Sequence, residues 1–459
     1  MNKYEELFNK QKSYFNTNIT RSYEWRLEQL DRMEHMLKEN DKAFFEAMGK
    51  DFRTSVGEQV QEWGGCFGSI EHTRAELKKW MEPTQVALPK FLADSGHTGT
   101  IYRDPYGVTL IIGPFNGPVV LLLLPAVTAL SAGNTVVLKT NIDTPATGAL
   151  LAELVAKYFE PEVLTTVSGD VEVVTELLKI PFNFIFFTGS TRVGKIIMKA
   201  AAENLTPVLL ELGGQNPVLV DQTANIPDAA RKIVWGATTW AGQFCASPGY
   251  AYVHESVAAE FVEEAKKALL EMYGPDPKSN PEFSKIINAK AVKRLAALID
   301  PEKVIAGGQS DEEARYMAPT LLYPISWDDQ IMREEIFGPI LPILTYSDVN
   351  EAYLKMQQTE RPLTTYIFSQ DEATIELIMN GLTFGGGAVN QVNAQLFIST
   401  LPFGGVGNAG MGQYYTVNGF NNLTHAKSVL TSPADVAIEH LIPPYTREKI
   451  EALSQWSKF

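Results

Sequence analysis

Short apolar runs alternate with helical stretches through the middle of this chain, and this alternation constrains its fold more than any other feature. Such alternation predicts parallel strands in a sheet that is covered by helices on both faces. A second α/β series follows Glu211. The runs of the first series are Thr135–Leu138, Leu164–Val167 and Phe184–Phe187, with a helix at 147–159, and those of the second are Val218–Val220, Ala251–His254, Leu341–Thr345 and Thr365–Phe368. We therefore expect an α/β fold, with a parallel sheet followed by a second α/β unit.

The N-terminal region carries two other patterns. Between residues 20 and 52, apolar side chains recur at helical spacing among many charges, which predicts two amphipathic helices. After Pro83, short runs at 85–88, 99–102 and 108–112 are separated by proline, glycine and aspartate, which is typical of strands joined by turns. At 459 residues, the chain is long enough for more than one domain.

Charge and cysteine content exclude several classes of function. The 54 acidic residues outnumber the 39 basic ones, and the net charge of −15 argues against nucleic acid and against an anionic membrane surface as partners. The two cysteines, Cys66 and Cys245, lack metal-ligand spacing, so we expect neither a metal site nor a disulfide framework. The chain begins without an apolar signal core, and its longest apolar run, residues 119–130, is too short to span a bilayer. These features predict a cytoplasmic protein.

Two motifs combine residue types that suit covalent catalysis. Glu211 ends an apolar run and begins Glu-Leu-Gly-Gly, while Cys245 lies within Gly-Gln-Phe-Cys-Ala-Ser-Pro. A thiolate can attack a carbonyl to form a covalent intermediate, which a carboxylate can then release by activating water. A free cysteine is more often a small buried hydrophobe, but the glycine, serine and proline around Cys245 are poor core-strand residues. Cys66 matches no such motif, and we interpret it as structural.

Glu-Leu-Gly-Gly and Gly-Gln-x-Cys resemble the two signatures of the aldehyde dehydrogenase superfamily, and the resemblance covers nearly the whole chain. It implies that Cys245 is the nucleophile and that Glu211 is the base that activates water. Asn116 follows a predicted strand in Gly-Pro-Phe-Asn-Gly-Pro. It matches the asparagine that holds the oxyanion together with the backbone N–H of the nucleophile, although a turn asparagine is usually only turn chemistry. The resemblance thus implies oxidation of an aldehyde to a carboxylic acid through a thiohemiacetal and a thioester.

The resemblance also implies a nicotinamide cofactor, NAD or NADP. The loop Thr-Gly-Ser-Thr-Arg-Val-Gly follows a strand and opens a helix expected at 196–202. Glycines at such a place let backbone N–H groups approach a pyrophosphate. By their match to the family's motifs, the cofactor-binding residues are Gly189, Ser190 and Gly194 in this loop, Lys139 for a ribose, Glu335 for the nicotinamide ribose and Phe337 beside the ring.

Another glycine-rich segment, residues 405–410, formally fits the pattern G-x-G-x-x-G. It follows Pro402-Phe403 instead of a buried strand, and no βαβ unit fits downstream. We therefore predict no dinucleotide site there. In the resembling family this loop shapes the mouth of the active site.

The family's architecture divides the chain into three parts. Residues 1–83 and 105–208 would form a Rossmann-like NAD(P)-binding domain, and residues 209–424 a catalytic domain. Residues 84–104 and 425–459 would form a small β oligomerisation arm and a C-terminal tail, with a strand near 428–438. The short N-terminal region and Pro443-Pro-Tyr resemble the short, class 3-like branch, which is often dimeric and acts on aromatic and medium- or long-chain aldehydes. We accordingly expect a homodimer.

Two groups of positions near the motifs depart from the family pattern. Ile142 stands where a glutamate often holds the adenosine ribose 2′-hydroxyl, which predicts that NADP is used at least as well as NAD. Asp143 would supply this carboxylate if the turn were shifted by one residue. Gln215 and Asn216 replace the usual Lys-Ser, which removes a positive charge four residues after Glu211.

The presumed substrate entrance departs as well. Phe115 replaces the family's usual tryptophan and Gly117 a large residue, so we expect both changes to widen or reshape the entrance. The apolar residues 119–123 favour an aliphatic or aromatic aldehyde, unless these side chains are helix core.

Three alternatives remain open. A catalytically degenerate family member would use the same fold as a cofactor-binding or structural protein, which the altered positions 117, 142, 215 and 216 would allow. A cysteine hydrolase or acyltransferase would need a histidine partner, and none of the six histidines lies in a comparable motif. Acyl transfer to coenzyme A would use the same nucleophile, but acylating relatives generally lack the base at Glu211.

Overall fold

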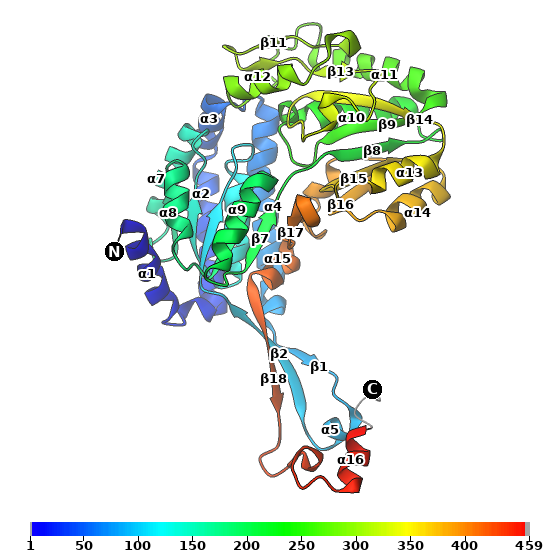
Figure 1. The fold of residues 1–459 in the computed structure, drawn as a ribbon. Coiled ribbons are helices and arrows are strands. Elements are labelled where there is room, and N and C mark those ends of the chain that lie inside the picture. Colours follow the sequence, from blue (N-terminus) through cyan, green and yellow to red (C-terminus); the bar gives the residue numbers. More distant parts are fainter. Residues whose placement is uncertain (1, 455–459) are drawn as a thin grey trace.

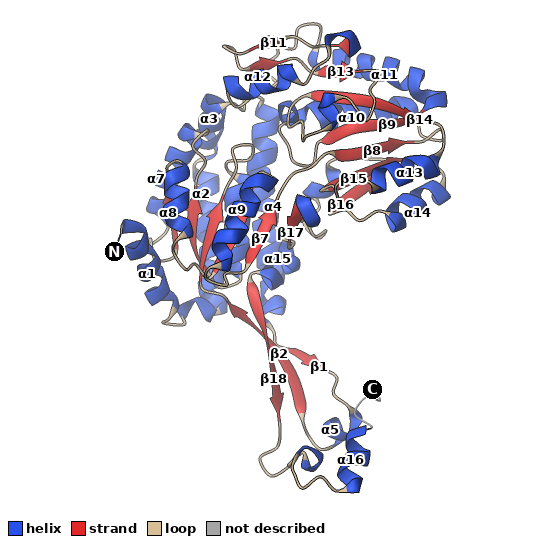
Figure 2. Cartoon of the chain, in the orientation of Figure 1, coloured by secondary structure: helices blue, strands red, loops and turns tan. Residues whose placement is uncertain are grey.

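The computed structural model describes residues 2–454, which form two α/β lobes and a protruding arm (Figure 1). The two lobes lie side by side, and the arm extends away from them. Each lobe is built on its own sheet, with helices packed against it (Figure 2). The predicted α/β class, with a parallel sheet, a second α/β unit and a small β arm, is confirmed.

The sheet of the N-terminal lobe has the strand order β17-β7-β6-β3-β4-β5, and every pair is parallel except β17 with β7. Strands β3, β4 and β6 are buried along their whole length. Helices cover both faces of the sheet, which explains why these strands are continuous apolar runs instead of alternating patterns. The strands are β3 (Val108–Ile112), β4 (Thr135–Lys139), β5 (Leu164–Val167), β6 (Phe184–Thr188), β7 (Val208–Glu211) and β17 (Gly410–Met411).

The helices of this lobe include both that were expected between residues 20 and 52. The lobe contains α1 (Lys3–Phe15), α2 (Tyr23–Glu39), α3 (Asp41–Asp51), α4 (Val56–Met81), α6 (Val120–Ser131), α7 (Pro145–Tyr158), α8 (Val171–Leu178), α9 (Thr191–Ala202) and α15 (Thr416–Asn422). Helix α9 begins earlier than predicted because the Ser190 side chain accepts the N–H of Val193 and caps it. Helices α1 and α4 were not predicted; α4 contains four glycines, which weaken a helical pattern.

The second lobe is built on a sheet with the order β10-β13-β14-β9-β8-β15-β16, parallel except for β10 with β13. Its strands are β8 (Asn216–Val220), β9 (Pro248–His254), β10 (Val304–Ala306), β13 (Thr320–Leu322), β14 (Ile340–Tyr346), β15 (Thr364–Phe368) and β16 (Gly386–Val389). Its helices are α10 (Ile226–Thr238), α11 (Glu255–Tyr273), α12 (Ala289–Ala297), α13 (Val349–Gln357) and α14 (Glu372–Gly381), and a hairpin joins β11 (Ser310–Asp311) to β12 (Tyr316–Met317). All four apolar runs predicted after Glu211 lie within strands of this sheet.

The arm is a three-stranded antiparallel sheet with β2 at its centre. It consists of β1 (Thr84–Val86), β2 (Thr98–Pro105) and β18 (Thr424–Thr431), with α5 (Lys90–Asp94) and α16 (Arg447–Ser454) near its tip. The predicted strand bounds were wrong in two places: β1 ends at Val86, and β18 covers 424–431 instead of 428–438. Pro433 lacks the N–H that a continued ladder needs. Residues 455–459 of the predicted tail lie outside the described residues.

Candidate active site

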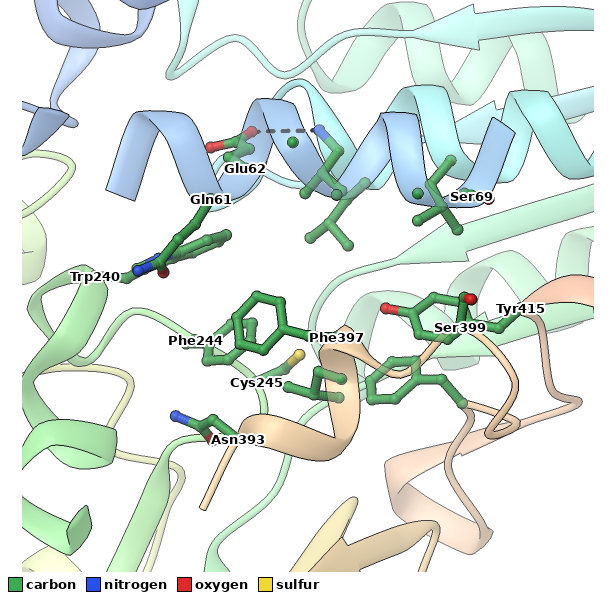
Figure 3. A pocket seen from close by; sticks show the side chains of 18 of the residues that line it. Gln61, Glu62, Ser69, Trp240, Phe244, Cys245, Asn393, Phe397, Ser399 and Tyr415 are labelled. Carbon is green, nitrogen blue, oxygen red and sulfur yellow. Dashed lines mark hydrogen bonds between the residues drawn. The ribbon is translucent and has the colours of Figure 1, made fainter. Parts of the chain in front are cut away.

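Cys245 lies where two cavities meet. The smaller cavity has a volume of about 340 Å³, and its walls come from α4, α6 and the segments 235–245 and 393–416. The larger cavity, of about 850 Å³, is lined by the carboxyl ends of β3, β4, β6 and β7 and by residues 334–337. Cys245 lines both, and its sulfur points into the smaller one (Figure 3). In open α/β sheets, ligands bind at the carboxyl ends of the strands. The larger cavity lies at this edge of the sheet.

The backbone before Cys245 has an unusual conformation. Trp240, Ala241 and Gly242 all have left-handed φ values, of 57°, 50° and 65°, which residues other than glycine rarely adopt. A β-carbon on Gly242 would lie 2.1 Å from the carbonyl oxygen of Gly338, so only glycine fits. This turn follows α10 and reverses the chain, which brings Cys245 to the cavities before β9 begins.

The two residues that replace the family's usual Lys-Ser hold this region together. The Asn216 side-chain amide donates hydrogen bonds to the carbonyl oxygens of Cys245 (2.8 Å) and Ser247 (2.9 Å), and its oxygen accepts the N–H of Thr364 at 2.9 Å. The Gln215 amide donates to the carbonyl oxygens of Ile331 (2.8 Å) and Glu334 (2.7 Å). Asn216 thus positions the cysteine loop, and Gln215 positions the segment that carries Glu335.

Asn116 and Glu211 present buried polar atoms to the larger cavity. Asn116 follows β3, and its side-chain nitrogen is buried with no hydrogen-bond partner among the described residues. Glu211 ends β7, is 3% exposed, and neither of its carboxylate oxygens has such a partner within residues 2–454. Leaving buried polar groups unpaired is costly, so these atoms indicate a place for a ligand or water. Burial raises the pKa of Glu211 well above its ordinary value.

The electrostatic surroundings of Cys245 oppose ionisation of its thiol. Burial, together with the nearby carboxyl groups of Glu335 and Glu211, raises the pKa of the Cys245 thiol. Burial also raises the pKa of Glu335 to about 7. Because a thiol is a weak nucleophile until it ionises, the reactivity of Cys245 depends on the charge of its two acidic neighbours.

Most of the predicted cofactor residues line the larger cavity. Lys139, Gly189, Ser190, Glu335 and Phe337 all do so. The Lys139 ammonium group donates to the carbonyl oxygens of Thr140 (2.6 Å) and Gly169 (2.7 Å), and burial lowers its pKa.

Gly194 is the exception among them. It does not line the cavity: a β-carbon there would lie 2.7 Å from the Leu212 side chain. We interpret it as the glycine that lets α9 pack closely on the end of β7, since a fingerprint glycine often serves helix–strand packing.

The structure adds two cationic residues that the motifs did not indicate. Arg192 and Arg294 both line the larger cavity, and Arg294 donates to the carbonyl oxygens of Glu335 and Ile336. Arg192 lies in the first turn of α9, where the helix dipole also favours anions. Arg192 stands within the glycine loop quoted above, so its place beside that loop could have been inferred from the sequence.

Near Lys139, the sequence left open whether Ile142 or Asp143 takes the position of the family's glutamate, and the structure favours Ile142. Ile142 lines the larger cavity, whereas Asp143 does not. The Asp143 carboxylate instead accepts a hydrogen bond from Asn288 at 3.3 Å. The turn is therefore not shifted so as to bring a carboxylate into the cavity at this position.

The expectation for the substrate entrance was wrong in part. Phe115 lines the larger cavity, where its ring centre lies 5.7 Å from that of Phe337. Gly117 lines neither cavity. Of the apolar residues 119–123, Val120 and Leu121 line the smaller cavity together with Leu124, while Leu122 and Leu123 are core of α6 and Val119 is buried just before it. The sequence could not separate these faces because the helix is apolar all round.

The glycine-rich loop 405–410 lies beside the end of β7. It leads into β17, which pairs antiparallel with β7 so that Gly410 lies opposite Glu211. The loop lines neither cavity, whereas Phe403, Tyr414 and Tyr415 beside it line the smaller one. Cys66 is fully buried in α4, which agrees with its structural interpretation.

Three kinds of feature were not found among the described residues. Within residues 2–454, no group of three or more His, Cys, Asp or Glu side chains is arranged to hold a metal ion. No helix in this part of the chain is both long and apolar enough to cross a bilayer. Among the described residues that line the two cavities, none is a histidine.

Comparisons with known proteins agree with the geometry. Residues 2–429 match the model of the aldehyde dehydrogenase family. The 4,4'-diaponeurosporen-aldehyde dehydrogenase of Staphylococcus aureus is 40% identical over 97% of this chain and 97% of its own, and the dimeric NADP-preferring aldehyde dehydrogenase of Canis lupus familiaris is 35% identical over 97% and 98%. A solved structure described as the substrate-bound state of Staphylococcus aureus AldH has a TM-score of 0.95 at 38% identity and covers 100% of both chains. These matches confirm the predicted resemblance, and the chain belongs to the aldehyde dehydrogenase family.

Proposed function

We propose that this protein oxidises an aliphatic or aromatic aldehyde to the carboxylic acid, with NAD or NADP as cofactor and Cys245 as nucleophile. The observation that carries the proposal is the position of Cys245, which lines both the apolar cavity and the cavity with Glu211 and Asn116. An aldehyde in the first cavity and a cofactor in the second would meet at this sulfur. The Staphylococcus aureus relative is named for an aldehyde and the canine one as NADP-preferring, which supports both parts.

The three catalytic residues divide the reaction into two steps. Once ionised, the Cys245 sulfur bonds to the aldehyde carbon, and the oxygen becomes an anion that accepts hydrogen bonds from the Asn116 amide and the Cys245 N–H. Removing one such donor typically costs roughly 10²–10³ in rate. After oxidation to the thioester, Glu211 takes a proton from the attacking water, the carbon–sulfur bond breaks, and the acid leaves. A raised pKa makes Glu211 a stronger base than an exposed carboxylate.

The residues of the larger cavity fit a nicotinamide dinucleotide. A bound nicotinamide dinucleotide would supply the hydride acceptor that this oxidation needs. The Gly189 N–H donates to the carbonyl oxygen of Glu211 at 2.9 Å, so the donors available to a pyrophosphate are the backbone N–H groups at the start of α9, which Ser190 caps, and the Arg192 cation. Lys139 and Glu335 would bind the two riboses, and Phe337 would lie beside the ring. Since Ile142 provides no carboxylate, a 2′-phosphate is not repelled there, and NADP is used at least as well as NAD.

The test is turnover of an aldehyde panel with each cofactor, using two cysteine variants. Cys245→Ala is expected to abolish turnover, while Cys66→Ala, in the core of α4, is the matched control that retains it. A hydrolase would turn over without added nicotinamide cofactor. Absence of turnover on every aldehyde, with cofactor binding intact, would support a degenerate family member and overturn the proposal.

We also infer the division of labour between the parts of the chain. Residues 1–83 and 105–208 would bind the cofactor, residues 209–424 would carry the nucleophile and base, and the arm would join two copies in a homodimer. The arm presents apolar side chains to solvent, among them Phe91 (36% exposed) and Leu430 (50% exposed). Light scattering of the intact protein would show a mass twice the 50.8 kDa of one chain, and a monomer would contradict this part of the proposal.

A further inference from the structure

Cys245 and Ala246 are the two central residues of the turn that precedes β9. The N–H of Ser247 donates to the carbonyl oxygen of Phe244 at 2.9 Å and closes this turn. Among the described residues, no oxygen accepts the N–H of Cys245 or of Ala246. Both N–H groups interact instead with the Cys245 sulfur. The turn therefore presents two backbone donors to the atom that the proposed function makes the nucleophile.

The carbonyl oxygens of the same segment face side chains of β8 and β15. The Asn216 amide donates to those of Cys245 (2.8 Å) and Ser247 (2.9 Å), and the Tyr366 hydroxyl donates to that of Ala246 at 2.8 Å. Because a peptide group is planar and trans, its C=O and its N–H point in opposite directions. The hydrogen bond from Asn216 to the Cys245 carbonyl therefore directs the N–H of Ala246 away from β8, toward the sulfur.

Asn216 itself is held rigidly and lies outside both cavities. It begins β8, is 1% exposed, and lines neither cavity. Its side-chain oxygen accepts the N–H of Thr364 at 2.9 Å, which fixes the amide so that its nitrogen faces the turn. The reverse orientation would place the amide oxygen against two carbonyl oxygens. Asn216 can thus act on a reaction at Cys245 only through the backbone of the turn.

The other groups around the sulfur do not favour a thiolate. Burial, followed by the carboxyl groups of Glu335 and Glu211, raises the pKa of the Cys245 thiol, whereas the N–H groups of Cys245 and Ala246 lower it. Three phenol groups also interact electrostatically with the sulfur, those of Tyr366, Tyr414 and Tyr415. None of these five side chains is a cation. The favourable contribution comes from backbone dipoles, and their direction matters for that reason.

We propose that Asn216 is a positioning residue for the nucleophile, because it directs the Ala246 N–H at the Cys245 sulfur and thereby stabilises the thiolate. The proposal rests on the proposed function in taking Cys245 as the nucleophile. In the step that Asn216 assists, the S–H bond breaks, its electron pair stays on sulfur, and the proton passes to water. The serine that is usual in the family has one hydroxyl hydrogen, so it can hold only one of the two carbonyl oxygens.

Asn134 offers a matched control, since it makes the same three kinds of hydrogen bond elsewhere. Its amide donates to the carbonyl oxygens of Ala129 (3.2 Å) and Leu423 (2.9 Å), and its oxygen accepts the N–H of Gly107 at 2.9 Å. It is fully buried and lines neither cavity. Asn134→Ala should therefore lower the melting temperature, as Asn216→Ala does, without altering the turn at Cys245.

The first measurement is the rate at which iodoacetamide modifies Cys245 in the full-length protein at pH 8. Asn216→Ala is expected to react about tenfold more slowly than the unaltered protein, because a thiol pKa raised by one unit lowers the thiolate fraction tenfold. Asn134→Ala should react at the rate of the unaltered protein. Equal slowing in both variants would mean that lost stability, and not the direction of an N–H, controls the sulfur.

A second measurement separates ionisation from access to the sulfur. The thiolate is titrated through its ultraviolet absorbance, with Cys245→Ala as the blank. The curve of Asn216→Ala should be displaced by about one unit to higher pH, whereas a merely less accessible sulfur would leave the curve unchanged. Binding of NADP should be the same in all of the asparagine variants, since neither asparagine lines the larger cavity.

If Asn216→Ala fails to fold, Asn216→Ser replaces it in both measurements. Its single donor should give a rate below that of the unaltered protein and, where both variants fold, above that of Asn216→Ala. Folded Asn216 variants with the titration curve of the unaltered protein would overturn the proposal. Neither measurement needs turnover, so failure of the unaltered protein to oxidise any aldehyde, which would refute the proposed function, is a separate and recognisable outcome.

Discussion

The guanidinium group of Arg53 donates a hydrogen bond to the backbone carbonyl oxygen of Asn116. Arg53 is fully buried, pairs with Glu62 at 3.0 Å, and its guanidinium carbon lies 3.8 Å from the ring centre of Trp240. The Glu58 carboxylate, 3.6 Å from the same guanidinium group, accepts a hydrogen bond from the backbone N–H of Trp240. One arginine thus joins the loop of the candidate oxyanion donor to the turn that precedes Cys245.

Replacing Arg53 should therefore destabilise the protein strongly. Arg53→Met is expected to lower the free energy of unfolding by about 3–5 kcal/mol, because it leaves buried carboxylates without their partner. Urea unfolding measures this change. Arg74→Met is the matched control on α4: Arg74 pairs with Asp31 and Glu34 but is 31% exposed, and such surface pairs contribute about 0–1 kcal/mol. Similar losses in both variants would contradict the role of the buried cluster.

Replacing Glu211 should separate the two chemical steps. Glu211→Gln removes the base while keeping the shape of the side chain, so the first turnover should proceed and release of the acid should slow by about 10²–10⁴-fold. Rapid-mixing measurement of reduced cofactor should show a burst of one equivalent per site, followed by slow turnover. Loss of the burst itself would mean that Glu211 acts before the thioester forms.

The reactivity of Cys245 should depend on the charge of Glu335. Glu335 has a pKa of about 7, so it is neutral well below pH 7 and negative above it, where it raises the pKa of the thiol. Glu335→Gln removes this charge, which lowers the thiol pKa and increases the thiolate fraction at alkaline pH. We expect iodoacetamide to modify Cys245 about tenfold faster in this variant at pH 8.

The same comparison at pH 6 provides the internal control, since Glu335 is then neutral in the unaltered protein and the two rates should agree. Peptide mapping by mass spectrometry distinguishes Cys245 from the fully buried Cys66, which should stay unmodified in both proteins. A rate difference of equal size at both pH values would mean that the glutamate acts through packing and not through charge.

The cofactor preference should depend on residue 142. Ile142 lines the larger cavity, and a carboxylate there would bind a ribose 2′-hydroxyl and repel a 2′-phosphate. Ile142→Glu is therefore expected to lower kcat/KM for NADP at least tenfold relative to that for NAD. Ile142→Gln, which has a similar size and no charge, is the control. A strong preference of the unaltered protein for NAD would show that the inference from Ile142 is wrong.

Sequence patterns predicted elements whose signals are local. The buried strands β3, β4 and β6 are continuous apolar runs because both faces of their sheet are covered, so a few consecutive residues suffice to identify them. The motifs around Cys245, Glu211 and Asn116 were also visible, because each is a short run of neighbouring residues. Helix α4 was missed because its glycines weaken the periodic pattern, and β18 was misplaced because strand bounds depend on the pairing partner β2.

The sequence by itself determined the α/β class, the family and the candidate residues of the reaction, since each is encoded in short runs of neighbouring residues. Only the tertiary structure decided that Asn216 holds the Cys245 loop, that Phe115 faces the larger cavity, and that Arg53 links two loops. Contacts of this kind join segments far apart in the chain, and which side chains meet depends on how whole helices and sheets pack against one another.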